Sequence, residues 1–375
     1  MTPDKAFLQA ILEEPDDDGP RLIYADWLEE HGYPERAEFI RAQIELAKPP
    51  AARTRTRRRE LERRVKALWK QHGPTWAKQP GGGSSTLEWW ERGFCSYYWA
   101  DDFATLVSEL PRRLTEAPIQ RVGFNFRRRE DAARLLEMPL LHRLRSLCLF
   151  GSGFDEDELM GDADIRLLTQ CPHLAGLEEL DLTQHRIGPE GLRQLAHAPG
   201  LPALHSLALY ENPCGDEGLR ILSGSPLAPR LRKIHLSGGG DDPLTAAGVR
   251  VLTNTPTLAN LRVLNFDNTT IGDAGARCIA RSVHFSSLTE LWLHSCEIRD
   301  AGVKAIAASP HLANLEVLDL STNWTVGHAA AVALLESPYL KRLRYLNLWR
   351  CERLTGEDER MLRVRFRSRV NFQRS

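Results

Sequence analysis

The sequence LEELDLTQHRIGPEGLRQLA, residues 177–196, is the most informative part of the chain because related copies of it return through the second half. Each copy has leucine-like residues at its first, fourth and sixth places and an apolar residue at its eleventh. Seven copies are in register, and their first residues are separated by 27, 27, 30, 27, 27 and 28 residues. These first residues are Leu177, Leu204, Leu231, Leu261, Leu288, Leu315 and Leu343.

One strand and one helix cannot bury their apolar faces alone, so units of this kind form a core only by stacking. The pattern therefore predicts an α/β solenoid with a parallel concave sheet and convex helices. It resembles the leucine-rich repeat in its longer, ribonuclease-inhibitor-like form. Upstream, the copy from Leu144 fits well, the one from Ile119 fits loosely, and FCSYYW fits only through Phe94, Tyr97 and Trp99.

The ninth place of such a repeat is often Asn or Cys, and its side chain sits inside the turn. Four copies keep this pattern, with Asn212, Cys296, Asn323 and Cys351. The other three carry His185, Gly239 and Thr269, for which we expect looser turns. The insertion SGGGDDPLT in the copy from Leu231 predicts a bulged loop.

The front of the chain predicts a small all-α N-terminal domain. Capping residues and apolar spacing indicate helices over 2–14, 21–31, 34–48 and 56–72, the last ending at His72-Gly73-Pro74. QPGGGSS then reads as a link, and TLEWWERGFCSYYW predicts two strands joined by a turn at Arg92-Gly93.

LIYADWLEEHGYPERAEFIRAQIEL, residues 22–46, is similar to a short bacterial module called a repeat-companion domain, which precedes repeat arrays in planctomycete-type bacteria. The RGF hairpin and the end LRVRFRSRVNF look related as well. The resemblance implies architecture and no defined activity. It rests on Asp18, Arg21, Tyr24, Ala25, Asp26, Trp27, Leu28, Glu30, Gly32, Glu38, Phe39, Ile40, Gln43 and Leu46.

We divide the chain into five parts. These are a helical repeat-companion domain (1–48), a basic helix with a Gly-rich linker (49–86), a capping hairpin with irregular repeats (87–143), the leucine-rich repeats (144–356) and a C-terminal cap (357–375).

Composition points to a water-soluble protein. The 375 residues are 42% hydrophobic and 26% charged, with a net charge of −1, so no global field favours nucleic acid or an acidic membrane. No apolar run is long enough to span a membrane, and the start carries acids where a secretion signal needs a basic and then an apolar stretch. We therefore expect a cytoplasmic protein without membrane association.

The seven cysteines include no CxxC pair, which favours reduced thiols over a zinc site or a disulfide framework. Nucleophile-elbow, zincin and phosphate-loop motifs are absent from the sequence, so we predict no catalytic residues, no metal and no cofactor. The acids Asp26, Glu29, Glu30 and Glu38 form either a carboxylate cluster or a solvated helix face, and Tyr24 and Trp27 favour helix packing.

The main functional hypothesis is a non-catalytic scaffold that binds a protein partner on the concave face. Alternate strand residues point away from the core, and Trp, Tyr and Arg are the usual anchors of protein interfaces. The predicted contact residues are Tyr210, Trp292, His294, Asp319, Tyr345, Trp349 and Arg350.

An alternative is nucleic-acid binding through residues 53–66, RTRTRRRELERRVK. Its contact residues would be Arg53, Arg55, Arg57, Arg58, Arg59, Arg63 and Arg64. We favour instead a basic helix that faces acidic ones, because residues 1–48 hold five Lys/Arg against twelve Asp/Glu and residues 49–80 hold ten against two. A third hypothesis, a GTPase-activating protein-like regulator, rests only on a eukaryotic class that shares this repeat form.

Overall fold

The computed structural model describes residues 3–48, 55–79, 81–82, 84, 86–152, 156–237 and 242–372, arranged in two compact units. The first unit comprises Met1–Asn125 with Arg143–Leu147, and the second comprises Phe126–His142 with Cys148–Ser375. Thr2, Arg53 and Gly239, named above, lie outside the described residues.

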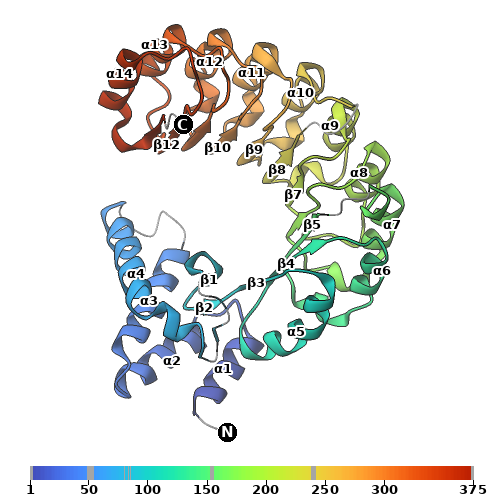
Figure 1. The fold of residues 1–375 in the computed structure, drawn as a ribbon, viewed down its shortest axis with the longest axis vertical. Helices are drawn as coiled ribbons and strands as arrows, with labels where there is room; N and C mark the ends of the chain where they lie inside the picture. Colours follow the sequence, from blue (N-terminus) through green and yellow to red (C-terminus); the bar gives the residue numbers. More distant parts are fainter. Residues whose placement is uncertain are drawn as a thin grey trace. The chain divides into compact units, whose positions relative to one another are not determined.

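The second unit alternates short strands with helices, as the repeat predicts (Figure 1). Its helices are α6 (Glu130–Leu136), α7 (Asp162–Gln170), α8 (Pro189–Ala196), α9 (Gly215–Ser223), α10 (Ala246–Thr253), α11 (Gly272–Arg281), α12 (Asp300–Ala307), α13 (His328–Glu336) and α14 (Gly356–Phe366). Its strands are β6 (Glu179–Asp181), β7 (Ser206–Leu209), β8 (Lys233–Leu236), β9 (Val263–Asn265), β10 (Glu290–Trp292), β11 (Val317–Asp319), β12 (Tyr345–Asn347) and β13 (Val370–Asn371). β5 (Ser146–Gly151) crosses the division between the units.

These strands form a parallel sheet in chain order, which confirms the predicted leucine-rich repeat solenoid. The first leucine of every copy is no more than 1% exposed, because the leucines of strand and helix fill one continuous core. Within this unit the strands line the inner side of the arc and the helices its outer side (Figure 1).

The ninth residues of the copies bind the turns from within. Asn323 is 1% exposed; its Nδ2 donates to the carbonyl of Leu293 at 2.8 Å, and its Oδ1 accepts from the amide of Ile298 at 2.9 Å. His185 makes equivalent bonds and is 3% exposed, and Thr269 donates to the carbonyl of Phe266. The expected looser turn at His185 was therefore wrong, because the imidazole satisfies the same buried backbone groups as Asn323 does. The bond of Thr269 stays within its own copy, so the expectation for its turn remains a prediction.

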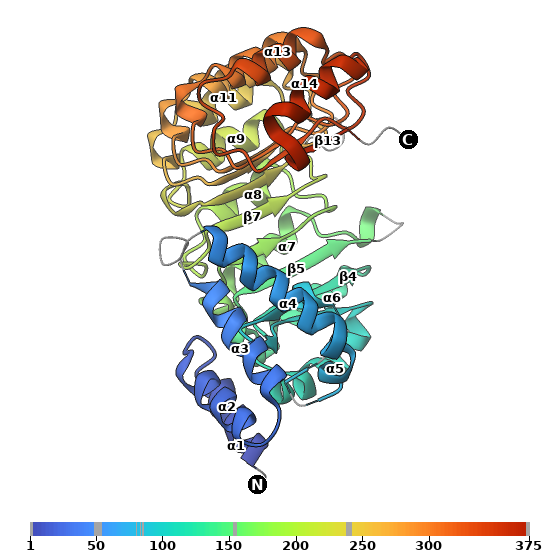
Figure 2. The ribbon, with the colours of Figure 1, turned by 90° about the vertical axis from the view of Figure 1, so that its left-hand side faces the viewer.

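The first unit holds α1 (Pro3–Glu13), α2 (Gly19–Glu30), α3 (Pro34–Ala47), α4 (Arg55–Trp76) and α5 (Phe103–Glu116), with β1 (Trp90–Glu91), β2 (Phe94–Cys95), β3 (Tyr97–Ala100) and β4 (Arg121–Phe126), whose last residue, Phe126, belongs to the second unit. Helices α3 and α4 run side by side (Figure 2). Their shared core includes Phe39 and Trp76, whose ring centroids lie 4.9 Å apart.

This packing corrects the predicted end of the fourth helix. The helix continues through Gly73 and Pro74 to Trp76, four residues beyond the expected stop. Trp76 is 6% exposed, and burying its ring against Phe39 stabilises the last turn more than the missing amide of Pro74 destabilises it.

The β1–β2 hairpin has the predicted turn, with Arg92 at φ 50° and Gly93 at φ 91°. Helix α3 holds this hairpin from inside the unit. Gln43 accepts from the amide of Gly93 at 2.7 Å and donates to the carbonyl of Trp90 at 3.1 Å. Arg36 donates to the carbonyl of Gly93 at 2.6 Å, so the two motifs of the N-terminal region are parts of one packed module.

The first strand of the parallel sheet has a different register from the one expected. β3 pairs with β4 so that the buried Tyr98 lies beside Val122, while Tyr97 and Trp99 are half-buried on the other face. The prediction that Tyr97 and Trp99 face the core was wrong by one residue, and one residue exchanges the two faces of a strand. Gly123 explains the choice, because a Cβ there would lie 2.6 Å from the ring of Trp99.

The basic C-terminal stretch closes the sheet of the second unit. β13 pairs with β12 in parallel, and α14 begins with a capping box between Thr355 and Asp358. Arg365 donates to the carbonyls of Leu335 and Ser337, which satisfies backbone groups at the C-terminal end of α13.

All seven cysteines are unpaired. Among the described residues, no helix is both long and apolar enough to cross a membrane.

Candidate functional site

Neighbouring strands of the second unit place their outward side chains in rows on the inner face. The strand register aligns β10, β11 and β12 residue by residue. Strands lie about 4.8 Å apart, so the members of a row are in reach of one another. One row is Glu290, Val317 and Tyr345, and the next is Trp292, Asp319 and Asn347.

An aromatic pair spans these rows. The ring centroids of Trp292 and Tyr345 are 6.4 Å apart at an interplanar angle of 35°. Trp292 donates its Nε1 proton to Glu290 at 3.2 Å, which fixes the orientation of the indole. Tyr345 is 37% exposed, and burial raises the pKa of its phenol. The pair therefore presents a neutral aromatic surface on rigid strands.

Asp319 lies beneath this surface at the centre of a polar network. It is 5% exposed and accepts from the amide and the hydroxyl of Ser321 and from Asn347 Nδ2 at 2.7 Å. Asn371 of β13 donates to Asn347 in turn, at 3.1 Å. Because its oxygens are occupied, Asp319 orders its neighbours and offers little to a partner.

Two further predicted residues follow β12. The guanidinium carbon of Arg350 lies 4.5 Å from the ring centroid of Trp349, within the range of a cation–π contact. Trp349 is half-buried, and Arg350 is exposed with φ 56°. These side chains belong to the same edge of the sheet as the end of β12.

The left-handed conformation of Arg350 is a property of the eighth place in each copy. All the described eighth residues have φ between 52° and 61°. This conformation turns the chain sharply from the inner strand toward the helix. The residues are Gln184, Glu211, Asn268, Ser295, Thr322 and Arg350.

His294 and Tyr210 have different surroundings. His294 Nδ1 lies 2.8 Å from the hydroxyl of Ser321, so His294 joins the network of Asp319. Tyr210 follows β7, three strands before β10, and its hydroxyl accepts from Asn268 Nδ2. At about 4.8 Å per strand Tyr210 is on the order of 14 Å from the aromatic pair, so the structure separates it from the other predicted contacts.

Two residues of this region were missed by sequence reasoning. Asn371 joins the network from β13, and the irregular C-terminal segment carries no repeat pattern that would place it there. Trp324, in the turn after β11, is 52% exposed. The sequence signal for its exposure was its position directly after Asn323. The ninth residue of each copy is buried in the turn, so the side chain that follows it must point outward.

The basic helix α4 is partly neutralised by acidic neighbours. Arg64 pairs with Glu38 and Arg57 with Glu45, both on α3. Arg58 pairs with Glu62 within α4. Arg59 and Arg63 are exposed and Arg55 begins the helix. These pairs support a basic helix that faces acidic ones.

The N-terminal carboxylates and aromatic residues have structural partners as well. Arg41 bridges Asp26 and Glu29 at 2.6 and 2.7 Å. Tyr24 and Trp27 pack on Phe7 of α1, with centroid distances of 5.4 and 5.7 Å. Ion pairing and helix packing therefore account for the clustered carboxylates and aromatic residues, which could otherwise have indicated an active site.

The buried thiols are unsuited to nucleophilic chemistry. Burial raises the pKa of Cys296 to about 12 and that of Cys95 to about 11, so neither is a thiolate at neutral pH. Cys296 Sγ lies on the inside of the turn, 3.1 Å from the carbonyl of Phe266 and 3.3 Å from the carbonyl of His294. The described residues contain no group of three or more His, Cys, Asp or Glu arranged to hold a metal ion.

Comparison with known families agrees with this architecture. Residues 175–196, 257–280 and 286–307 match the family model described as Leucine Rich repeat. With the strand order and the buried leucines, these matches define the fold as a leucine-rich repeat solenoid. A search of curated proteins gave no match.

Several solved structures are similar at low sequence identity. The yeast Rad7 and Elc1 complex contains a chain with 14% identity and a TM-score of 0.45, covering 90% of this chain and 81% of that one. The internalin inlF from Listeria monocytogenes has 15% identity, coverage of 61% and 67%, and a TM-score of 0.35. A Bacteroides fragilis protein has 16% identity, coverage of 68% and 67%, and a TM-score of 0.39.

Proposed function

We propose that the chain is a non-catalytic scaffold that binds a protein partner on the inner face of its solenoid, around Trp292 and Tyr345. The observation that carries the proposal is this aromatic pair, which stands on two strands and is oriented by hydrogen bonds. Nothing in the repeat requires large aromatic side chains at outward strand positions.

The contact set follows from exposure and order. Trp292, Tyr345 and Trp349 supply apolar anchors, and Arg350 supplies a charge beside them. Asp319 is left out of this set because it is buried, and it serves as the group that holds Asn347 in place. Rigid anchors lose little entropy on binding, which favours affinity.

Affinity capture from the native host, with quantitative mass spectrometry, tests the proposal. The variant W292A/Y345A/W349A should lose captured partner by at least about a hundredfold, because interface anchors contribute about 2 kcal/mol or more each. The control variant L167A/V283A removes two exposed apolar side chains from α7 and from the turn after α11.

If the parent and the control variant recover a specific partner and the triple variant does not, the result supports binding on the inner face. Equal recovery by all three proteins contradicts the proposed site, provided that thermal unfolding shows each variant folded. If the proposal is right, the captured partner should also bind the purified parent chain in isothermal titration calorimetry.

We propose that the N-terminal region is a repeat-companion module. We also propose that the protein is bacterial and cytoplasmic. The support is the joint packing of helix α3 and the RGF hairpin through Gln43 and Arg36. Seven unpaired cysteines fit a reducing compartment.

Nucleic-acid binding through α4 is a weaker alternative. Arg59 and Arg63 are exposed, but Arg57, Arg58 and Arg64 form ion pairs. A salt titration with duplex and single-stranded oligonucleotides decides the matter, because phosphate contacts give a steep dependence on salt. Absence of micromolar binding at low salt rules this alternative out.

A further inference from the structure

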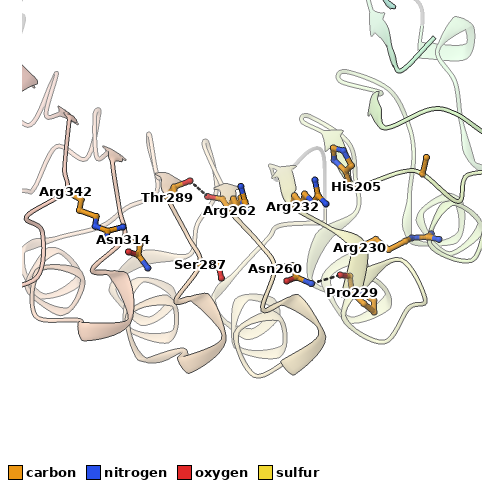
Figure 3. Close-up of a pocket in the computed structure, with 11 residues that line it drawn as sticks. His205, Pro229, Arg230, Arg232, Asn260, Arg262, Ser287, Thr289, Asn314 and Arg342 are labelled. Atoms are coloured by element: carbon orange, nitrogen blue, oxygen red, sulfur yellow. Dashed lines mark hydrogen bonds between the residues drawn. The ribbon is translucent and has the colours of Figure 1, made fainter. Parts of the chain in front are cut away.

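A second surface of the repeat unit gathers basic side chains at the edge where the strands begin. The residues concerned stand directly before and after the first leucine of successive copies. Figure 3 shows them in a row, from Arg342 at one end to His205 and Arg230 at the other. Sequence reasoning assigned no role to these places.

The row lines a cavity of about 700 Å³. Its lining includes Arg230, Arg232, Arg262 and Arg342, together with His205. No carboxylate belongs to the lining, and within the part of the chain that the structure describes none of these four arginines has an ion-pair partner. Unpaired guanidinium groups that share one cavity repel each other, so an anion would relieve the repulsion.

Two buried nitrogens at one end of the cavity give an independent indication. Arg230 Nε and His205 Nδ1 are buried without a hydrogen-bond partner among the described residues. The other ring nitrogen of His205 lies 3.5 Å from Glu178. Buried polar atoms in proteins are nearly always paired, so unpaired ones beside a cavity point to a ligand.

The backbone beneath the row is fixed, so the charges are preorganised. The carbonyl of His205 accepts from the amides of Arg232 and Lys233, at 2.8 and 3.2 Å. The carbonyl of Arg232 accepts from Arg262 and the following residue in the same way. The side chains therefore project from a ladder of strands about 4.8 Å apart, and a ligand need not order the backbone.

The dimensions and chemistry of the cavity favour an extended peptide. Five inter-strand spacings separate the copy that begins at Leu204 from the copy that begins at Leu343. The edge between them is therefore on the order of 24 Å long, which is longer than a small phosphate compound. Guanidinium forks suit carboxylates. The hydroxyl of Thr289 and Nδ2 of Asn314 already donate to the carbonyls of Arg262 and Ser286, so their oxygens are left to accept from peptide amides, and Ser287 adds a hydroxyl. No Phe, Tyr or Trp belongs to the lining to stack nucleotide bases.

We propose that this edge binds an extended acidic segment of a protein, with Arg232 and Arg262 pairing with its Asp or Glu carboxylates. The surface is separate from the aromatic pair of the inner face, so it would recognise either a second segment of the same partner or another protein. Hydroxyl and amide groups along the row would hold the peptide backbone in register.

Fluorescence anisotropy with the full chain and a labelled glutamate decapeptide tests the proposal, at about 20 mM salt to limit screening. The parent should bind the decapeptide saturably. The variant R232A/R262A should bind at least about tenfold more weakly, equivalent to about 1.4 kcal/mol. The control R250A/R281A removes two exposed arginines from the helices α10 and α11 and should leave the affinity unchanged.

A glutamine decapeptide and a thymidine oligonucleotide of similar length complete the experiment. No binding of the glutamate peptide, or equal loss in R232A/R262A and in the control, overturns the proposal. Tighter binding of the oligonucleotide overturns it in favour of nucleic acid. The variant W292A/Y345A/W349A should keep the peptide affinity, so failure of the inner-face proposal and failure of this one are told apart.

Discussion

His185 makes the stability of the second unit depend on pH in a way that one substitution should remove. Its Nδ1 accepts from the amide of Met160 at 3.2 Å, and its Nε2 donates to the carbonyl of Leu149 at 2.9 Å. The bond from Met160 requires the neutral ring, since protonation at Nδ1 would remove the acceptor, whereas Nε2 donates to Leu149 in either state. Burial lowers the pKa of His185 from 6.5 to about 4, against the opposing effects of the hydrogen bond to the carbonyl of Leu149 and the charge of Asp164.

The direction of the pH dependence follows from the pH at which the folded and the unfolded chain each bind a proton at His185. Above pH 6.5 His185 is neutral in both the folded and the unfolded chain. Between pH 6.5 and about 4 only the unfolded chain binds the proton, so the free energy of unfolding falls as the pH falls. At about 1.4 kcal/mol per unit of pKa, the loss reaches about 3 kcal/mol at pH 4.

The variant H185N should be almost as stable as the parent at pH 7.5, because Asn212 and Asn323 make the same kinds of bond at the ninth place. It should lack the loss of about 3 kcal/mol toward pH 4. Hydrogen-exchange mass spectrometry at several pH values, corrected for intrinsic exchange rates, reports the local free energy of opening around Met160 and Leu149. Parallel pH curves for parent and variant would show that His185 is not the group responsible for the pH dependence.

Four further substitutions test the packing. Asn323→Ala should destabilise the second unit by about 3–5 kcal/mol in denaturant unfolding, because buried amides and carbonyls lose their partner; a loss below about 1 kcal/mol would contradict this. Thr322→Gly should increase the free energy of unfolding by about 0.5–1 kcal/mol and raise the melting temperature, because a β-branched residue at φ 57° is strained and its buried hydroxyl has no hydrogen-bond partner among the described residues. A lower melting temperature would show that the strain is absent. Gly93→Ala should cost about 3 kcal/mol or more, because its Cβ would lie 2.5 Å from Ile40 at φ 91°, whereas Gly32→Ala, at φ 86° in open space, should cost about 1 kcal/mol. Equal melting temperatures of the two glycine variants would count against the contact with Ile40.

The repeat pattern was sufficient to predict the solenoid. Leucines at fixed places every 27 to 30 residues must be buried together, and only stacking of strand and helix achieves this for residues so far apart in sequence. The alternation of strand residues likewise predicted that Trp292 and Tyr345 face away from the core, since that depends only on local geometry.

Other features depend on contacts between residues that are distant in the sequence, and only the folded structure shows them. Trp99 faces away from the core because Gly123 makes room for it, and α4 extends to Trp76 because Phe39 receives its ring. Asp319 looked like a contact residue, yet Ser321 and Asn347 occupy its oxygens.

The basic edge has the same origin. Arg232 and Arg262 are 30 residues apart in the sequence and carry no motif. They directly precede the neighbouring strands β8 and β9, because the leucines between them place every copy in register with the next. The periodicity of apolar residues that must leave water is sufficient to predict that stacking from the sequence. The three-dimensional structure alone decided which polar side chains the stacking brought together, because polar residues at the edges are not constrained by the core.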